Sequence, residues 1–196
     1  MIKQTTLLAA SALSALAMHT AEININNKDA EGSVRFDIAQ FNAALEPESY
    51  MLGLRVINGH EDHSDLPNTD PIIEANFLLQ NPLKVNNNLI FGIGVKAVYT
   101  DLASGEYVAM PLGVEVQYRL PLTIDLPVHV GGVLYYAPEV LSFGDADNYF
   151  EYRLTADVEV VKNGSIIGGY RQIETDANGA GITYNHGLYV GFKFAF

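Results

Sequence analysis

The sequence contains no cysteine and no tryptophan, and its 196 residues include only 11 lysines and arginines against 23 aspartates and glutamates. Without cysteine the chain can form no disulfide, no thiolate nucleophile and no cysteine-ligated zinc or iron–sulfur site. The formal charge of −12 argues against nucleic-acid binding, because neutralising phosphates requires clustered lysine and arginine. With 48% apolar and 17% charged residues, the chain is also too apolar for a disordered protein.

The N-terminus carries an apolar run that is too short for a transmembrane helix. Lys3 precedes an alanine-rich stretch from Leu7 to Ala17, whereas a spanning helix needs roughly 20 apolar residues. The tripeptide Ala15-Leu16-Ala17 has the small residues that signal peptidase requires. We expect residues 1–21 to be a signal peptide, cleaved after Ala17 or, as the alternative, after Ala21. An uncleaved amphipathic helix is the other interpretation. Residues 22–196 are then one exported domain.

After Ala21, apolar residues recur at every second position, which is the period of a β-strand with two different faces. The alternation is clearest over residues 50–57, 73–80, 89–99, 110–119, 128–134, 152–160 and 187–196. Many of these runs are longer than a soluble strand and close to the roughly 9–11 residues of a strand that crosses a bilayer. Glycine is also frequent on the polar face, which suits a crowded interior. The pattern favours a membrane barrel over a soluble one, with apolar side chains toward lipid and polar side chains toward the lumen.

The connections give the number of strands. Residues 58–71, 101–106, 138–147 and 176–184 are expected as outer loops, and residues 42–48, 81–87, 120–125 and 162–164 as periplasmic turns. Two further strands, over residues 22–26 and 33–41, complete the barrel. The predicted fold is therefore an all-β, antiparallel, up-and-down transmembrane β-barrel of about ten strands. Eight strands is the alternative, with the first hairpin outside the wall.

The expected inward positions carry equal numbers of opposite charges. The basic residues are Arg35, Arg55, Lys96, Arg119, Arg153 and Lys193, and the acidic ones are Asp37, Glu74, Glu115, Glu151, Asp157 and Glu159. A buried charge without a partner is costly, and the interior of a barrel of about eight strands is just filled by side chains. We therefore predict a lumen largely plugged by ion pairs. A narrow conducting path and a lumen site for a small ligand are the alternatives.

The expected outer loops hold ten acidic residues and no lysine or arginine. Such loops would repel lipopolysaccharide phosphates unless Ca²⁺ or Mg²⁺ bridged the two, although acidic side chains also simply keep loops soluble. One loop contains His60, Asp62, His63 and Asp65 beside Ser64. These are residue types of weak metal sites and of acyl transfer, but the order matches no hydrolase motif. We predict no cofactor apart from possible loop-bound Ca²⁺ or Mg²⁺, and no catalytic residue.

Four segments of the second half of the chain have a recognisable pattern: residues 135–141, 147–152, 169–174 and 187–192. They resemble the YfaZ family of exported Gram-negative proteins, and the resemblance is specific from about Gly131 onward. It implies an outer-membrane barrel without an assigned activity. The shared residues suggest a polar and aromatic cluster near the outer mouth, formed by Tyr135, Tyr149, Glu151 and Arg171. The final strand, with Phe192, Phe194 and a C-terminal Phe196, resembles the signal read by the barrel assembly machinery.

Together these observations predict a monomeric protein of the Gram-negative outer membrane, with a structural or interaction role. Its expected partners are outer-membrane lipid, lipopolysaccharide and the barrel assembly machinery, and not nucleic acid. A narrow, porin-like channel for small solutes is the first alternative. A surface hydrolase or acyltransferase that uses His60 or His63 is the second.

Overall fold

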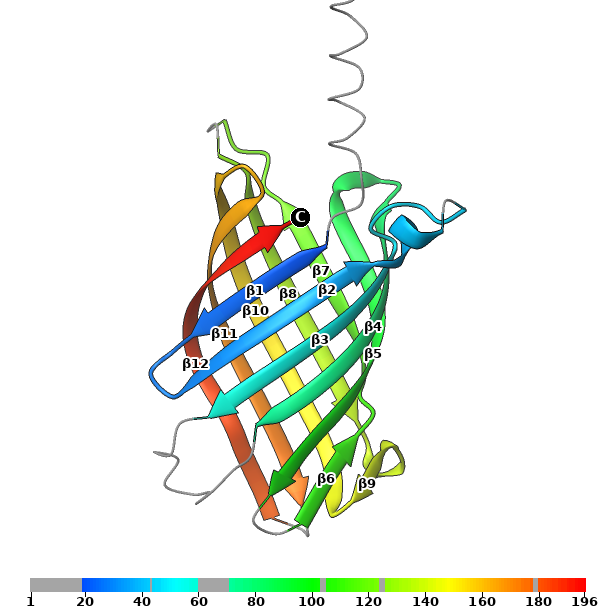
Figure 1. Ribbon diagram of the computed structural model, residues 1–196, viewed down its shortest axis with the longest axis vertical. Helices are drawn as coiled ribbons and strands as arrows, with labels where there is room; N and C mark the ends of the chain where they lie inside the picture. Colours follow the sequence, from blue (N-terminus) through cyan, green and yellow to red (C-terminus); the bar gives the residue numbers. More distant parts are fainter. Residues whose placement is uncertain (1–18, 43, 60–70, 103–104, 124–125, 178–179) are drawn as a thin grey trace, which may run out of the picture.

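The computed structural model describes residues 19–42, 44–59, 71–102, 105–123, 126–177 and 180–196. Within these residues the chain forms one closed, antiparallel barrel of ten wall positions (Figure 1). Closure comes from two ladders: β1 pairs with β12, and β4 pairs with β5. The strands are β1 (Thr20–Ile25), β2 (Asp29–Asp37), β3 (Tyr50–Gly59), β4 (Ile72–Leu83), β5 (Asn86–Leu102), β6 (Gly105–Ala109), β7 (Leu112–Arg119), β8 (Val128–Ala137), β9 (Ser142–Gly144), β10 (Ala146–Val161), β11 (Gly164–Ala177) and β12 (Ala180–Ala195).

Two wall positions each consist of two strands in line. β6 and β7 both pair with β5, and they are separated at Met110 and Pro111. Pro111 has no N–H to donate to a neighbouring strand, so a ladder breaks there. The next position is interrupted at the same level, where η2 (Glu139–Leu141) separates β8 from β9. The Met110 N–H donates to the Leu141 carbonyl at 2.8 Å and joins the two breaks.

The ten strands include the first hairpin, because β1 pairs with β12 on one side and with β2 on the other. The predicted boundaries differ in several places. The predicted outer loop over residues 176–184 is mostly strand, since β11 and β12 stay paired to Ala177 and Ala180. The predicted loop over residues 101–106 is shortened in the same way by the β5–β6 pair. Residues 38–41, predicted as strand, form the 3₁₀ turn η1 (Ile38–Phe41), which the Asp37 side chain caps by accepting from the Ala39 N–H.

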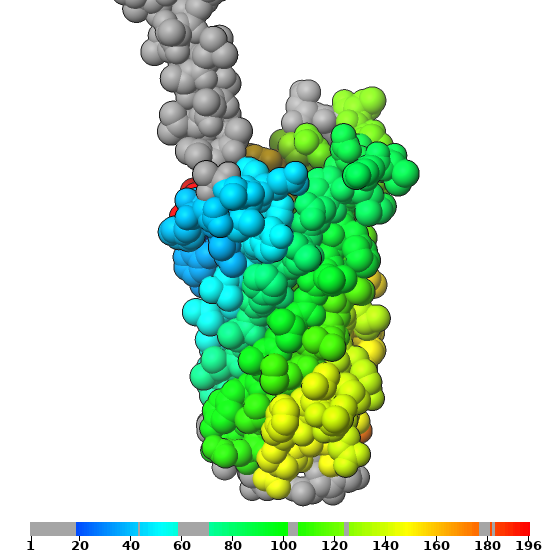
Figure 2. All heavy atoms as spheres, turned by 90° about the vertical axis from the view of Figure 1, so that its right-hand side faces the viewer, coloured from blue at the N-terminus to red at the C-terminus, as the bar shows by residue number. Residues whose placement is uncertain are grey.

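The start of β1 and the C-terminus lie at the same end of the barrel, which we call the terminal end; the opposite end is the far end (Figure 1). At the terminal end, His19 and Phe196 exchange two backbone hydrogen bonds of 2.9 and 2.8 Å. At the far end, the residues around β9 lie against β5 and β6 (Figure 2). Among the described residues, no helix has the length and hydropathy needed to span a bilayer.

The faces of the wall have the polarity of a membrane barrel. Outward side chains such as Leu188, 76% exposed, and Ile23, 65% exposed, are apolar, whereas inward Glu151 and Arg171 are fully buried. A soluble barrel has the opposite arrangement, because its apolar side chains must leave water. The outward row is apolar on strand after strand and forms a belt around the molecule.

Inward glycines provide room for large lumen side chains. A Cβ added at Gly113 would lie 2.5 Å from the Tyr135 ring, and one at Gly169 would lie 2.6 Å from the Tyr189 hydroxyl. Outward Gly168, next in the chain, would meet nothing within 4 Å. The glycines of the polar face therefore allow tyrosine rings to lie flat against the inside of the wall.

Candidate functional site in the barrel lumen

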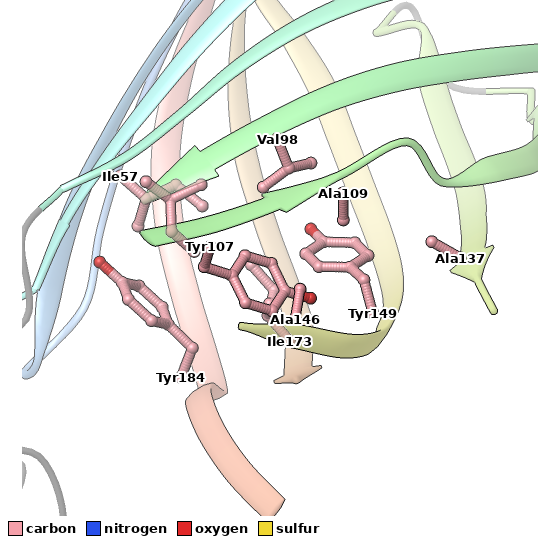
Figure 3. Close-up of a cluster of buried hydrophobic side chains, with 10 residues drawn as sticks. Ile57, Val98, Tyr107, Ala109, Ala137, Ala146, Tyr149, Ile173 and Tyr184 are labelled. Carbon is pink, nitrogen blue, oxygen red and sulfur yellow. The ribbon is translucent and has the colours of Figure 1, made fainter. Parts of the chain in front are cut away.

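An apolar layer crosses the lumen toward the far end (Figure 3). Its side chains come from β3, β4, β5, β6, β8, β10, β11 and β12, so the layer draws on nearly the whole circumference. Most of them are under 4% exposed. The members are Ile57, Ile72, Val98, Tyr107, Ala109, Ala137, Ala146, Tyr149, Ile173 and Tyr184.

Two tyrosines anchor this layer. The Tyr107 hydroxyl donates to the Asn148 backbone carbonyl, which joins β6 to β10 inside the barrel. The Tyr149 hydroxyl donates to Glu151 Oε2 at 2.8 Å, toward the terminal end. Both rings are fully buried, and each hydroxyl has the partner that a buried phenol requires. The apolar layer is therefore connected directly to the charged groups beneath it.

Glu151 is the centre of the first group of charges. Arg55 binds both of its oxygens, with Nη1–Oε1 at 2.6 Å and Nη2–Oε2 at 2.8 Å. Lys96 Nζ lies 2.7 Å from Oε2 of the same carboxylate and 3.2 Å from Glu74 Oε2. Arg55 also donates to Glu74. The four side chains are 0–5% exposed and consist of two acids and two bases.

Glu31 is the centre of the second group. Arg153 Nη2 lies 3.0 Å from each oxygen of Glu31, and Arg171 donates to the same carboxylate. Arg171 also binds Asp29 Oδ1 at 2.7 Å. The two groups are joined by a 3.8 Å contact between Arg55 Nη1 and Glu31 Oε2.

The two groups together contain four acids that are 0–2% exposed and four bases among the described residues: Asp29, Glu31, Glu74 and Glu151, with Arg55, Lys96, Arg153 and Arg171. A fifth carboxylate, Glu22, is 21% exposed and lies 3.6 Å from Arg153 Nη1 at the edge of the second group. The equal numbers of the eight residues matter because seven of their side chains are 0–5% exposed. Removing one member of a buried pair leaves an uncompensated charge and typically costs about 3–5 kcal/mol. We call these eight residues the charge layer.

A cavity of about 580 Å³ occupies the lumen between the charge layer and the terminal end. Its lining runs from Arg55, Glu74, Lys96 and Glu151 to Thr20, Asn163 and Ala195, and it includes no residue of the apolar layer. The described lumen is therefore a polar cup that opens at the terminal end. The sequence analysis predicted a lumen plugged by ion pairs, with a ligand site as an alternative. It did not predict a lumen divided into an apolar half and a polar half.

Two further ion pairs line the wall of the cup. Arg35 forms a two-point contact with Glu115, at 2.9 and 3.1 Å, and Glu115 also accepts from the Tyr135 hydroxyl at 3.0 Å. On the other side, Asp157 lies 3.1 Å from Lys193 Nζ and 3.2 Å from His129 Nδ1. These pairs are partly exposed to the cup, unlike the charge layer.

The structure places most of the sequence-predicted lumen residues in these pairs, with exceptions near the terminal end. Arg119 is exposed there, beside His129 on the neighbouring strand. Glu159 accepts from the Asn163 N–H at 3.0 Å in the β10–β11 turn. Asp37 faces inward but caps η1.

Sequence reasoning missed Asp29 and Glu31 because it began the second strand at Ser33. β2 in fact begins at Asp29, so Asp29 and Glu31 continue the inward face of Ser33 and Arg35. The alternation through Asp29, Glu31 and Ser33 was a usable signal. The orientation of Arg171 was left open, and the structure places it inward.

The residues of the proposed outer-mouth cluster lie in the lumen, but they do not form one contact set. Tyr149 contacts Glu151, whereas Tyr135 contacts Glu115 and lies under Lys96, whose Nζ is 4.0 Å from the ring centroid. Arg171 is held by Glu31 and Asp29. Its guanidinium is joined to Glu151 only through Glu31 and the cations that share it.

The predicted metal and catalytic candidates His60, Asp62, His63 and Asp65 lie outside the described residues, as does Ser64. Among the residues that the structure describes, no group of three or more histidines and carboxylates is placed to hold a metal ion.

Comparisons with known proteins identify the family. A family model described as "YfaZ precursor" matches residues 6–196. A solved structure described as "Bacterial polysaccharide outer membrane secretin" is 12% identical, with a TM-score of 0.43, over 90% of this chain and 69% of that chain. Another, described as "Unveiling the Mechanism Behind the in-meso Crystallization of Membrane Proteins", is 11% identical, with a TM-score of 0.38, over 91% and 83% of the two chains. No curated protein matches the sequence.

Proposed function

We propose, from the premise that this chain belongs to the YfaZ family, that it is a small outer-membrane barrel that does not conduct. In this proposal the protein has a structural role or binds other molecules at the membrane. The apolar outward belt supports the location, because such a surface is stable only against hydrocarbon. The closed ring of strand pairs supports a monomer, since the described wall closes on itself without a strand from a second copy.

In this proposal the terminal end faces the periplasm, as expected for a barrel whose C-terminal strand is read by the assembly machinery. Phe192, Phe194 and Phe196 lie on the outward face of β12 and its end, where such a reader has access to them. The cup then opens to the periplasm, and the apolar layer lies toward the cell exterior. Lipopolysaccharide and loop-bound Ca²⁺ or Mg²⁺ remain proposed partners of the acidic outer loops.

The apolar layer is the observation that carries the absence of conduction. An ion that crossed this lumen would have to leave the cup, pass the charge layer and then pass ten buried, mostly apolar side chains. Moving an ion through an apolar constriction without water is strongly unfavourable. A narrow channel is the second candidate, favoured by the cup, which already provides a polar path through half of the barrel.

Single-channel recording tests the proposal. The mature protein is refolded, its insertion is checked by heat-modifiable migration on a gel, and it is placed in a planar bilayer beside a reference porin as positive control. We expect no discrete steps from this protein. Reproducible steps that change in Arg55→Ala or Glu115→Ala would instead establish the channel.

A further inference from the structure

The outward face of β10 and β11 carries a cluster of four side chains with polar atoms, and this cluster plays no part in the lumen. Tyr152, Tyr170, Gln172 and Glu174 all point away from the lumen, since their neighbours Glu151, Arg153, Arg171 and Ile173 point into it. We call these four residues the wall patch. They are half-buried and lie within segments 147–152 and 169–174, which carried the resemblance to the family.

The wall patch is ordered by its own contacts. The Tyr152 and Tyr170 rings are stacked, with centroids 5.7 Å apart and an interplanar angle of 28°. Both hydroxyls donate to Gln172 Oε1, at 2.9 and 3.3 Å, and Gln172 Nε2 donates to Glu174. The result is a fixed platform of two aromatic rings beside an amide and a carboxylate.

The wall patch lies at a change of polarity on the outward face of the barrel. β12 pairs with β1 only from Val190 onward, and Val190 lies opposite Gly168 on β11. By this register Tyr170 and Gln172 lie one and two outward pair positions beyond the level at which β1 ends. Exposed Leu154 and Leu188 pair with Tyr170 on either side, and exposed Ile166 follows toward the terminal end. Toward the far end the outward positions of β11 and β12 are polar, whereas outward Phe150 on β10 contacts the Tyr152 ring. The patch thus lies on β11 where the outward row changes from apolar to polar side chains.

An aromatic girdle at the membrane boundary accounts for the tyrosines but not for Gln172 and Glu174. An amide and a carboxylate beside aromatic rings are suited to a sugar, whose ring C–H groups stack on the aromatic face while its hydroxyls bond to the polar edge. The outward positions of the described parts of β10, β11 and β12 hold no lysine or arginine. Because the patch holds the Glu174 carboxylate and no basic residue is near it on the described part of this face, its charge favours a ligand with hydroxyl or amine groups over one with phosphate.

We propose that the wall patch binds the saccharide headgroup of a glycolipid in the outer leaflet, with the acyl chains on the apolar wall beside it. Outward Ala156 and Gly168 lie opposite each other on the terminal side of the patch, and a Cβ at Gly168 would meet nothing within 4 Å. An acyl chain can lie in the shallow space that these small residues leave. The inference rests on the proposed membrane location and adds a ligand class to it.

Lipid retention tests the site. The mature protein is inserted into phosphatidylcholine nanodiscs that contain equal fractions of a monoglucosyl diacylglycerol and a phosphatidylglycerol with the same acyl chains. Native mass spectrometry then counts the lipids that stay bound. We expect the wild type to retain the glucosyl lipid in preference to phosphatidylglycerol. Tyr170→Ala and Gln172→Leu should each reduce that preference about tenfold, because each removes stacking or hydrogen bonds to the sugar.

Tyr99→Ala is the matched control, since Tyr99 is an outward, 41% exposed tyrosine on β5, away from the patch. It should leave the preference unchanged. Equal retention of the two lipids by the wild type, or an equal loss in Tyr99→Ala, would overturn the proposal. Full displacement of the lipid by soluble methyl glucoside would overturn it in favour of a free-sugar site. Insertion is measured separately by heat-modifiable migration, so failure to insert contradicts the membrane location, not the sugar specificity.

Discussion

At the scale of single residues, Glu151 shows what holds the lumen together. Its carboxylate accepts from Arg55, Lys96 and Tyr149 and has no exposed surface. In Glu151→Ala, Arg55 and Lys96 share only Glu74 at close range. We expect Glu151→Ala to lose about 3–5 kcal/mol of unfolding free energy, measured by urea unfolding in lipid vesicles.

The double variant Lys96→Met with Glu151→Gln is the control, because it removes one charge of each sign and restores the balance. It should recover part of the loss. A double variant as unstable as Glu151→Ala would mean that shape, and not charge balance, sets the stability of the layer.

The inward glycines make a second prediction at this scale. A Cβ at Gly169 would lie 2.4 Å from the Leu154 carbonyl oxygen and 2.6 Å from the Tyr189 hydroxyl, whereas one at Gly168 would meet nothing within 4 Å. Gly169→Ala should therefore destabilise the barrel by about 1–3 kcal/mol through overpacking. Gly168→Ala should change the stability by about 0.5 kcal/mol or less. Equal urea midpoints for the two variants would contradict the packing argument.

The pKa of Glu48, in the connection between β2 and β3, predicts that the stability of the fold depends on pH. Loss of hydration at the rim of the cup raises the pKa of the Glu48 carboxyl, and the nearby Asp37 raises it further. A raised pKa in the folded state means that the favourable contribution is present at low pH and is lost as the pH rises through the folded pKa. Charged Glu48 therefore weakens the fold at neutral pH.

The Glu48→Gln variant should be more stable than the wild type at pH 7, and this advantage should shrink as the pH falls toward the usual glutamate range. Unfolding midpoints measured across that range check the trend. Glu46→Gln, in the same connection but outside the lining of the cup, is the control for the loss of one negative charge there. A pH-independent difference for Glu48→Gln would exclude the electrostatic cause.

At the scale of elements, alternation and the positions of the connections predicted a barrel of about ten strands, with eight as the alternative, but they could not set the ends of the strands. The sequence of residues 176–184 is typical of a loop because Asp, Asn and Gly are frequent there, yet the β11–β12 ladder extends to Ala177 and Ala180. Ladder hydrogen bonds between neighbouring strands outweigh local turn preference at such positions. The break at Pro111 was visible in the sequence, but its partner break at η2 depends on the neighbouring strand and was not.

β1 also predicts where the signal peptide is cut. Thr20 and Ala21 pair with both β12 and β2, and the His19 ring packs near Phe36, Phe41 and Phe196. Cleavage after Ala21 would remove these residues, so we expect cleavage after Ala17. N-terminal sequencing of the exported protein should give Met18 as the first residue. A protein that begins at Glu22 should unfold at lower urea than one that begins at Met18.

At the scale of the whole molecule, the lumen is divided along its axis, and the sequence contains a trace of this division. The alternation weakens at Val56-Ile57, Ile72-Ile73 and Ala97-Val98, where both faces are apolar. Ile57, Ile72 and Val98 all belong to the apolar layer. Where several strands carry apolar residues on both faces at the same height in the wall, the pattern indicates an apolar layer across the lumen. The charge pairs, by contrast, depend on which inward side chains meet across the barrel, such as Arg55 and Glu151, and spacing does not reveal that.

The division predicts one-sided access to the cup. Because the chain contains no cysteine, a single introduced cysteine is a clean label. Thr155 and Gln117 line the cup, so Thr155→Cys and Gln117→Cys should react with a membrane-impermeant thiol reagent added on the terminal side only. The apolar layer should block the reagent from the far side.

Two exposed positions calibrate the experiment: Val85, 92% exposed in the β4–β5 turn, and Val140, 79% exposed in η2. With the protein inserted in one orientation, Val85→Cys should react from the terminal side and Val140→Cys from the far side. Labelling of Thr155→Cys from the side that labels Val140→Cys would establish a path through the apolar layer. It would also remove the main argument for a non-conducting barrel. Labelling confined to the side of Val85 would mean that whatever enters this lumen enters and leaves by the same end.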